Sequence, residues 1–324
     1  MRPFRLLCLL ALAAAALTAA AQPAYPVRPV TIVVPYAAGG PTDVVARALA
    51  EKLAPALGQP VLIDNKPGAN EAIAAAAVAT ARPDGHTLFF GTDAALALNQ
   101  HLYARLAYNA ETDLAPVTRV ASVDMLLVVP ASQGSRTVAD FVRTAREAPA
   151  PLGYASAGVG NPNHLAMEWF ASQAGLRLNH VPYRGITPAL PDLIGNRVGA
   201  LFSGISTVLP LVQDGKLAAL AISGSKRASA LPTVPTFAEA GYPQFEAAFY
   251  LGLAAPAGTP APAIQRLAAE VRKAVHGADF RAKAQQHWGI EPVADSPEEF
   301  AAFLRRDRAS AAQRVKISGA RLEP

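Results

Sequence analysis

The sequence predicts an α/β fold of two lobes, each a mostly parallel sheet flanked by helices. Its 324 residues are enough for one large domain or two smaller ones. Hydrophobic residues make up 52% and charged residues 16%, a composition that can bury a core and excludes intrinsic disorder. Strand-like apolar runs alternate with runs of helical spacing, and this alternation begins twice along the chain, which favours two lobes.

The N-terminal residues have the pattern of an export signal. Arg2 and Arg5 precede an apolar run over residues 6–17, and three alanines then supply a cleavage site before Gln22. The run is shorter than the roughly 20 residues that span a bilayer. We therefore expect residues 1–21 to be a cleaved signal peptide, and the mature chain to be exported without being embedded in the membrane.

The only cysteine, Cys8, lies inside this predicted signal. The mature chain then has no cysteine, which excludes a disulfide scaffold and every multi-cysteine metal site. Leu7 stands before it, where a lipid-anchored signal has a small residue. An exported chain with neither a disulfide nor a lipid anchor favours a Gram-negative periplasm.

The first predicted lobe begins with a β-α-β-α-β order. Residues 30–34 form a buried strand in this prediction, and a helix with apolar residues at helical spacing ends at Gly58. A strand at 61–64, a helix from Glu71 and a strand at 87–91 follow. This order is typical of parallel strands covered by helices.

The same order restarts at residue 152 and defines the second predicted lobe. Strands are expected at 152–157, 180–183, 198–204 and 217–224, with helices between them. Two more strands, at 125–129 and from Phe249 onward, are expected to cross between the lobes. The prediction assigns residues 22–123 and 249–324, with the helices after Pro260, to lobe 1, and residues 124–248 to lobe 2.

Two glycine-rich loops carry the predicted function, and each follows a strand and opens a helix. They read PYAAGGPTD at residues 35–43 and SAGVGNPNH at residues 156–164. Ligands of open α/β sheets lie beyond the carboxyl ends of the strands. A helix start offers free N–H groups and a positive dipole end to an anion. Either loop alone is equally well a structural turn, but the pair predicts a shared cleft that grips a small anion from both lobes.

The sequence does not match catalytic or metal-binding signatures. Gly158-Val159-Gly160 lacks the later glycine of a dinucleotide fingerprint, because Asn163 occupies that position. The six histidines show no metal-ligand spacing. His164, beside the second loop, is expected to hydrogen-bond a loop carbonyl rather than act as a base. The sequence thus predicts no catalytic residue, no cofactor and no metal.

The net charge of +5 does not indicate a nucleic-acid partner. Basic residues are scattered, and the densest cluster, at residues 305–308, is interrupted by Asp307. A solvated helix face explains this cluster better.

Motifs along the whole mature chain resemble one family. In order they include YPVRPVTIVVPYAAGGPTDVVARALAEKL, LGQPVLIDNKPGA, RPDGHTLFFGT, YASAGVGNPNHLA, HVPYRGITPALPDLIGNRV and LPTVPTFAEAGYP. They are similar to the periplasmic solute receptors of tripartite tricarboxylate transporters, the Bug receptors. The resemblance implies a monomeric Venus-flytrap binding protein, type II-like, that closes on a small carboxylated solute and delivers it to membrane permease subunits.

The resemblance also implies which residues bind the solute. The first loop would hold one carboxylate through backbone N–H groups and ordered water rather than a basic side chain. The implied ligand-binding residues of the first lobe are Tyr36, Ala37, Ala38, Gly39, Gly40, Thr42, Asp43, Thr92 and Asp93. Those of the second lobe are Ser156, Gly158, Gly160, Asn161, His164, Tyr183, Arg184, Gly185 and Ser203.

Several positions depart from the usual pattern of this family. Pro41 replaces a third loop glycine, Asn70 and Glu71 replace a glycine pair, and Ser203 follows Phe202 where an Asp-Asn pair is common. General anion binding is little affected by such changes. They bear instead on which solute is bound.

Asp93 is the departure with the largest electrostatic consequence, because a carboxylate at the cleft repels an anionic solute. Three interpretations are open. The side chain caps the following helix over residues 94–98, or binds an ammonium-like group of the solute, or pairs with a protein cation such as Arg184.

Two other functions remain open at this stage. A binding protein of identical fold would present its solute to a sensor kinase instead of a permease. An exported α/β enzyme is the third reading, opposed by the absence of a nucleophile–base pair in the sequence.

Overall fold

The computed structural model describes residues 25–245 and 247–322 of the chain. The predicted signal peptide, residues 1–21, lies outside the described residues. Of the helices that the structure describes, none is long and apolar enough to cross a membrane. Both glycine-rich loops lie within the described part, as do both predicted lobes except residues 22–24, 246, 323 and 324.

The first lobe is built on three parallel strands. They are β1 (Val30–Val34), β2 (Val61–Asn65) and β3 (Thr87–Gly91), in the order β2-β1-β3. Helices α2 (Pro41–Leu57) and α3 (Ala72–Ala79) connect them, which confirms the predicted order. After β3, a π-helical turn (Ala94–Leu98) leads into α4 (Asn99–Leu102).

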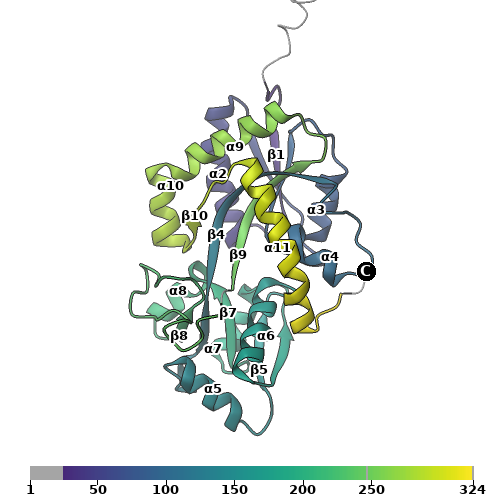
Figure 1. Cartoon of the computed structure of the whole chain (residues 1–324). Coiled ribbons are helices and arrows are strands. Elements are labelled where there is room, and N and C mark those ends of the chain that lie inside the picture. Colours follow the sequence, from purple (N-terminus) through teal and green to yellow (C-terminus); the bar gives the residue numbers. More distant parts are fainter. Residues whose placement is uncertain (1–24, 246, 323–324) are drawn as a thin grey trace, which may run out of the picture.

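Two long strands cross between the lobes, as Figure 1 shows. They are β4 (Leu114–Pro130) and β9 (Ala248–Pro256), which pair antiparallel as far as Asp124. From Met125 onward β4 pairs with strands of the second lobe. This change of partner lies next to the predicted lobe boundary at residues 123 and 124, and the boundary itself stays a prediction.

The structure starts β4 at Leu114, although the apolar pattern predicted a strand only from residue 125. Polar residues, including Arg119, Ser122 and Asp124, interrupt the first half of the strand. The register against β9 also shifts twice there. These interruptions break the alternation by which a strand is recognised in a sequence.

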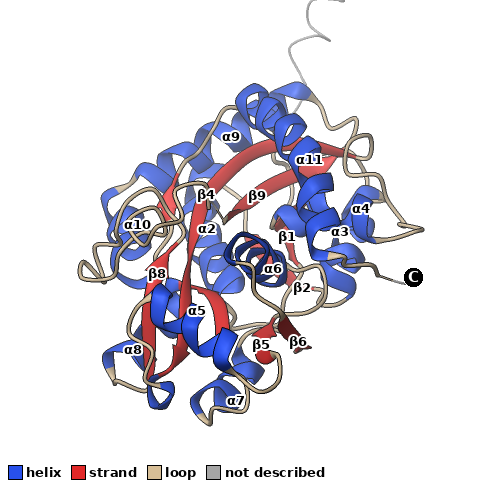
Figure 2. Cartoon of the chain, turned by 60° about the horizontal axis from the view of Figure 1, so that its bottom comes forward, coloured by secondary structure: helices blue, strands red, loops and turns tan. Residues whose placement is uncertain are grey.

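The second lobe repeats the parallel design. Its parallel strands are β5 (Leu152–Ser156), β6 (Leu178–Pro182) and β7 (Ala200–Gly204). Strand β7 also pairs with β4, and so does β8 (Leu217–Ile222). The helices of this lobe are α5 (Val138–Glu147), α6 (Pro162–Ala174), α7 (Leu190–Ile194) and α8 (Ile205–Gln213). Figure 2 shows helices arranged around the curled sheet.

The C-terminal segment packs against the strands of the first lobe. It contains α9 (Ala261–His276), α10 (Ala278–Lys283), the short β10 (Glu291–Pro292) and α11 (Pro297–Ser318). Near its start, α11 packs Phe300 and Leu304 into the first lobe. Near its end, Ala311 and Val315 contact Leu165 of α6. Helix α11 therefore touches both lobes.

Each lobe has a hydrophobic core of its own. Helices α2 and α9 pack against β1 and β3 through Leu49, Leu267 and their neighbours. In the second lobe, aromatic rings fill the space between the sheet and α5 and α6, and the centroids of Phe237 and Phe245 lie 4.3 Å apart. Separate cores joined by crossing strands confirm the two-lobed α/β class.

Candidate functional site

The first glycine-rich loop follows β1 and is open to solvent. Ala37, Ala38 and Gly39 are exposed, and Gly39 has a φ of 81°, which favours glycine. Helix α2 begins at Pro41 without a side-chain cap. No hydrogen bond between described residues uses the N–H of Thr42 or Asp43. These N–H groups at a helix start can bind an anion.

Asp43 fixes the shape of this loop. Its carboxylate is 1% exposed and accepts hydrogen bonds from the Gly39 N–H and Arg47 Nε, both at 2.8 Å. The amide of Asn65 donates to Asp43 and to the Tyr36 carbonyl, both at 2.9 Å. Burial acts to raise the pKa of Asp43, but the hydrogen bonds from Arg47, Gly39 and Asn65 together lower it. Asp43 is therefore ionised at neutral pH and holds the loop rather than facing a solute.

The second loop joins β5 to α6 and is held by its own side chains. Asn161 caps α6 by accepting the Asn163 N–H at 3.3 Å. The Ser156 hydroxyl accepts the Gly158 N–H at 3.1 Å and is hydrogen-bonded to His180 Nε2 at 2.6 Å. Ser156 is fully buried, so its hydroxyl positions the loop from behind.

His164 also supports this loop, by a different bond from the one predicted. We expected it to bond a loop carbonyl, but its Nδ1 accepts the Gly160 N–H at 3.0 Å. Its ring stacks on His180 with centroids 3.9 Å apart. Burial, with the neighbouring His180, lowers the pKa of His164 to about 3, and burial lowers that of His180 to about 4. Both rings are neutral at physiological pH.

The segment after β6 lies beside the second loop. The Tyr183 N–H donates to the Ser156 carbonyl at 3.0 Å, and the Gly185 N–H donates to the Ala157 carbonyl at 3.3 Å. Arg184 between them is exposed. Ser203 lies apart, fully buried at the end of β7, where its hydroxyl donates to the Gly204 carbonyl.

The lobes touch each other near the second loop. Asn70 of the first lobe donates to the Gly160 carbonyl at 3.5 Å and is paired with Asn99 at 2.9 Å. Leu102 packs so closely on Gly160 that a Cβ there would lie 2.5 Å from its side chain. Gly160 thus permits the close approach of the lobes.

Thr92 and Tyr36 both hydrogen-bond Glu71, a residue that the sequence prediction did not include in the site. The carboxylate of Glu71 accepts the Tyr36 hydroxyl and the Thr92 hydroxyl, both at 2.5 Å, and the Thr92 N–H at 3.0 Å. Thr92 and Glu71 are both 2% exposed. Burial raises the pKa of Glu71, against the hydrogen bonds from Thr92 and Tyr36. Its departure from the family pattern was visible in the sequence, but its partners were not.

Asp93 pairs with a protein cation from the C-terminal helix. Its Oδ2 lies 3.1 Å from Arg314 Nη1, and Arg314 Nη2 lies 2.5 Å from Asp307. The capping interpretation is wrong, because Asp93 makes no side-chain cap and the Thr92 hydroxyl accepts the Ala94 N–H instead. Burial raises the pKa of Asp93 to about 7, opposed by the charge of Arg314. The protein cation is Arg314 rather than Arg184.

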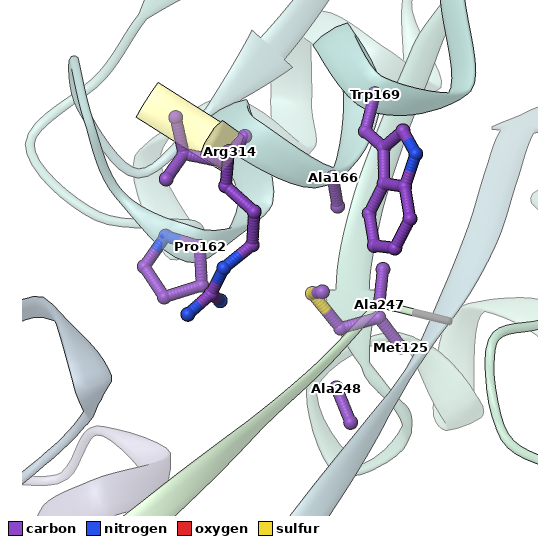
Figure 3. Close-up of a pocket in the computed structure, with 8 residues that line it drawn as sticks. Met125, Pro162, Ala166, Trp169, Ala247, Ala248 and Arg314 are labelled. Atoms are coloured by element: carbon purple, nitrogen blue, oxygen red, sulfur yellow. The ribbon is translucent and has the colours of Figure 1, made fainter. Parts of the chain in front are cut away.

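Two cavities lie on the α11 side of the crossing strands; Pro162 of the second loop lines the smaller one, and neither is lined by a residue of the first loop. A groove of about 450 Å³ runs between Trp169, the crossing strands and α11. Figure 3 shows a smaller pocket of about 20 Å³ beside it, where the Arg314 guanidinium lies near Pro162. Such a volume holds about one water, and Arg314 is already paired. The first loop, whose N–H groups at Thr42 and Asp43 are free, therefore remains the candidate anion site.

Two α/β lobes joined by crossing strands, with helix-start loops at strand ends, define the class of two-lobed solute-binding proteins. Residues 45–318 match the sequence model of the family described as tripartite tricarboxylate transporter family receptor, and the chain belongs to this family. It is a periplasmic solute-binding receptor of that family.

Relatives and solved structures agree with this assignment. The chain is 35% identical over 298 residues to protein BugT of Bordetella pertussis, covering 91% of both chains. It is similar to the structure of Rpa4515 of R. palustris with adipate, with a TM-score of 0.87 and 35% identity over 92% of this chain and 100% of that one. The structure of MatC from Rhodopseudomonas palustris with bound malate gives a TM-score of 0.82 and 33% identity over 90% and 100%.

Proposed function

We propose that the mature chain captures a small carboxylate between its lobes and delivers it to the membrane permease subunits of a tripartite tricarboxylate transporter. The observation that carries this proposal is the first loop, which Asp43 and Asn65 hold open with unused N–H groups at Thr42 and Asp43. Adipate and malate in two similar structures support a carboxylate as the solute.

The second lobe would complete the site when the lobes close. Arg184 is exposed, and no ion pair among the described residues involves it, so its charge is available to a bound anion. A Cβ at Gly158 or Gly185 would lie no closer than 3.7 Å to any described atom beyond its chain neighbours, so neither position is tightly packed. We propose lobe 1 as residues 22–123 and 249–324 and lobe 2 as residues 124–248. The protein would act as a monomer. Its signal peptide would direct export and be cleaved after residue 21.

Two alternatives differ from this proposal in testable ways. Presentation of the solute to a sensor kinase needs the same site and differs only in the partner. An enzyme would need a base, and the histidine nearest the site, His164, has a pKa lowered to about 3 and an Nδ1 already bonded to Gly160. We therefore propose binding without chemistry.

A thermal-shift screen of organic acids tests the binding. A solute at 100 times its Kd stabilises the fold by about 2.7 kcal/mol. In Gly39→Val, the branched side chain is strained at the positive φ of 81° and would occupy the open space beside the loop where the solute is proposed to bind, so the stabilisation should disappear. Gly215→Val is the matched control, since Gly215 has a φ of 68° and open surroundings in the turn between α8 and β8.

The two variants separate the outcomes. Loss of binding in Gly39→Val alone places the solute at the first loop, whereas equal loss in both variants points to a general folding defect. No stabilisation of the wild type by any acid would contradict the proposed function. Uptake of the identified solute by cells with and without the receptor then tests delivery, and unchanged uptake would favour the sensor-kinase alternative.

A further inference from the structure

Residues 69–71 adopt an unfavourable backbone conformation beside the first loop. Ala69, Asn70 and Glu71 have φ values of 47°, 47° and 74°, although none is glycine. L-residues rarely adopt this left-handed region, and such strain persists only where surrounding contacts enforce it. The pairing of Asn70 with Asn99 and the buried carboxylate of Glu71 supply those contacts.

The strained backbone places the Glu71 carboxylate among hydrogen-bond donors. Its three partners are the Tyr36 hydroxyl, the Thr92 hydroxyl and the Thr92 N–H. An ionised carboxylate only accepts hydrogen bonds, so this set of donors fits the charged form. No Lys or Arg among the described residues forms an ion pair with Glu71. Burial raises the pKa of Glu71, but these donors oppose that effect, and they hold the carboxylate in place without a matching cation.

This charge lies at the edge of the sheet that carries the candidate site. Strand β1 pairs with β3 with Val33 opposite Phe89, and continuing that register places Tyr36 beside Thr92. Both residues follow the carboxyl ends of adjacent parallel strands, where the first loop begins. Glu71 therefore binds donors that would otherwise be available to an anionic group of the solute.

The surrounding charges reinforce this effect. Asp93 is the next residue after Thr92, and the cation Arg314 is shared between Asp93 and Asp307. The described residues around Thr92 thus include three buried or half-buried carboxylates. Of the two guanidinium groups nearby, only that of Arg314 forms ion pairs with them, because that of Arg308 bonds the Leu96 and Ala110 carbonyls. A second anionic group of a solute would meet repulsion on this side of the site.

We propose that Glu71 determines specificity by acting as a built-in carboxylate, so that the site favours a solute with one carboxylate over a dicarboxylate of the same length. This inference rests on the proposed function. It also separates this chain from the similar proteins solved with adipate and malate, both dicarboxylates.

Calorimetry on matched acids tests the proposal. The pairs are hexanoate with adipate, 2-hydroxybutyrate with malate, and 4-methylbenzoate with terephthalate. The wild type should bind the monocarboxylate of a pair at least about tenfold more tightly than the dicarboxylate. In Glu71→Gly, which frees the three donors and relieves the positive φ, the dicarboxylate should gain at least about tenfold while the monocarboxylate changes less.

Two further variants control for poor folding of Glu71→Gly and for a general effect of removing a negative charge. Glu71→Gln removes the charge but keeps the side-chain shape, so it should shift the ratio in the same direction even if Glu71→Gly folds poorly. Glu51→Gln removes one negative charge from an exposed position of the same lobe and should leave the ratio unchanged.

The outcomes distinguish this inference from the function on which it rests. Equal wild-type affinity for both members of each pair, or an unchanged ratio in folded Glu71→Gly and Glu71→Gln, overturns the role of Glu71 while the receptor function stands. Failure of every acid to bind every version overturns both.

Discussion

The stacked pair His164 and His180 should make the protein lose stability in mild acid. Their pKa values in the folded protein are about 3 and about 4, below the ordinary value of about 6.5 in an unfolded chain. Below pH 6.5 the unfolded chain therefore binds protons that the folded chain does not. His164 then lowers the free energy of unfolding by up to about 1.4 kcal/mol per pH unit, or about 2 kcal/mol between pH 8 and pH 5, and the half-buried His180 lowers it by less.

The measurement is the free energy of unfolding from urea titrations at pH 8, 6.5 and 5. Other groups also titrate in this range, and Asp93, with its raised pKa of about 7, stabilises the fold as pH falls. The comparison is therefore between variants. His164→Gln should lose about 2 kcal/mol less than the wild type on going from pH 8 to pH 5, and His180→Gln should show a smaller change in the same direction, because its ring is only half-buried.

His276→Gln is the control, because His276 is exposed on the last turn of α9. It should leave the pH dependence of the wild type unchanged. If His164→Gln shows the same loss between pH 8 and pH 5 as the wild type, the stacked pair is not held neutral and the reasoning from its burial is wrong.

Three other predictions concern the contacts of Asp93, Asn65 and Gly160. Arg314→Met should lower the free energy of unfolding by about 3–5 kcal/mol at pH 8, because it leaves Asp93 buried without a partner; exposed Lys316→Met should have little effect in the same urea titration. Asn65→Ala removes the bonds to Asp43 and the Tyr36 carbonyl and should weaken solute binding in calorimetry by about 1–3 kcal/mol, and full affinity would show that this amide does not hold the loop. Gly160→Ala places a Cβ 2.5 Å from Leu102 and should reduce solute affinity by separating the lobes, whereas a variant that binds normally would show that this contact tolerates displacement.

Local sequence patterns were sufficient to predict most of the strands and helices. Apolar runs such as residues 30–34 and 87–91 are strands, and Gly58 ends α2 as predicted. The restart of the β-α order at residue 152 also predicted the second lobe correctly. The first half of β4 was missed because the polar residues Arg119 and Ser122 obscure a strand that only its pairing with β9 defines.

The site was harder to predict, because its contacts join residues that are far apart in the sequence. Asp93 and Arg314 are 221 positions apart, and no local pattern relates them. Glu71 stood out as a departure from the family pattern, but its bonds to Tyr36 and Thr92 depend on how β1 and β3 align. The predicted roles of the loop glycines rest on local backbone geometry, which the sequence does indicate.

We propose that the mature protein binds one small carboxylate and releases it unchanged. Native mass spectrometry of the protein purified from a periplasmic extract, followed by identification of the released small molecule, tests it most directly. We predict one organic acid per protein molecule, which rebinds in calorimetry and is recovered intact after incubation. A protein that carries no acid and binds none on addition, or one that converts the acid into another compound, would contradict the account.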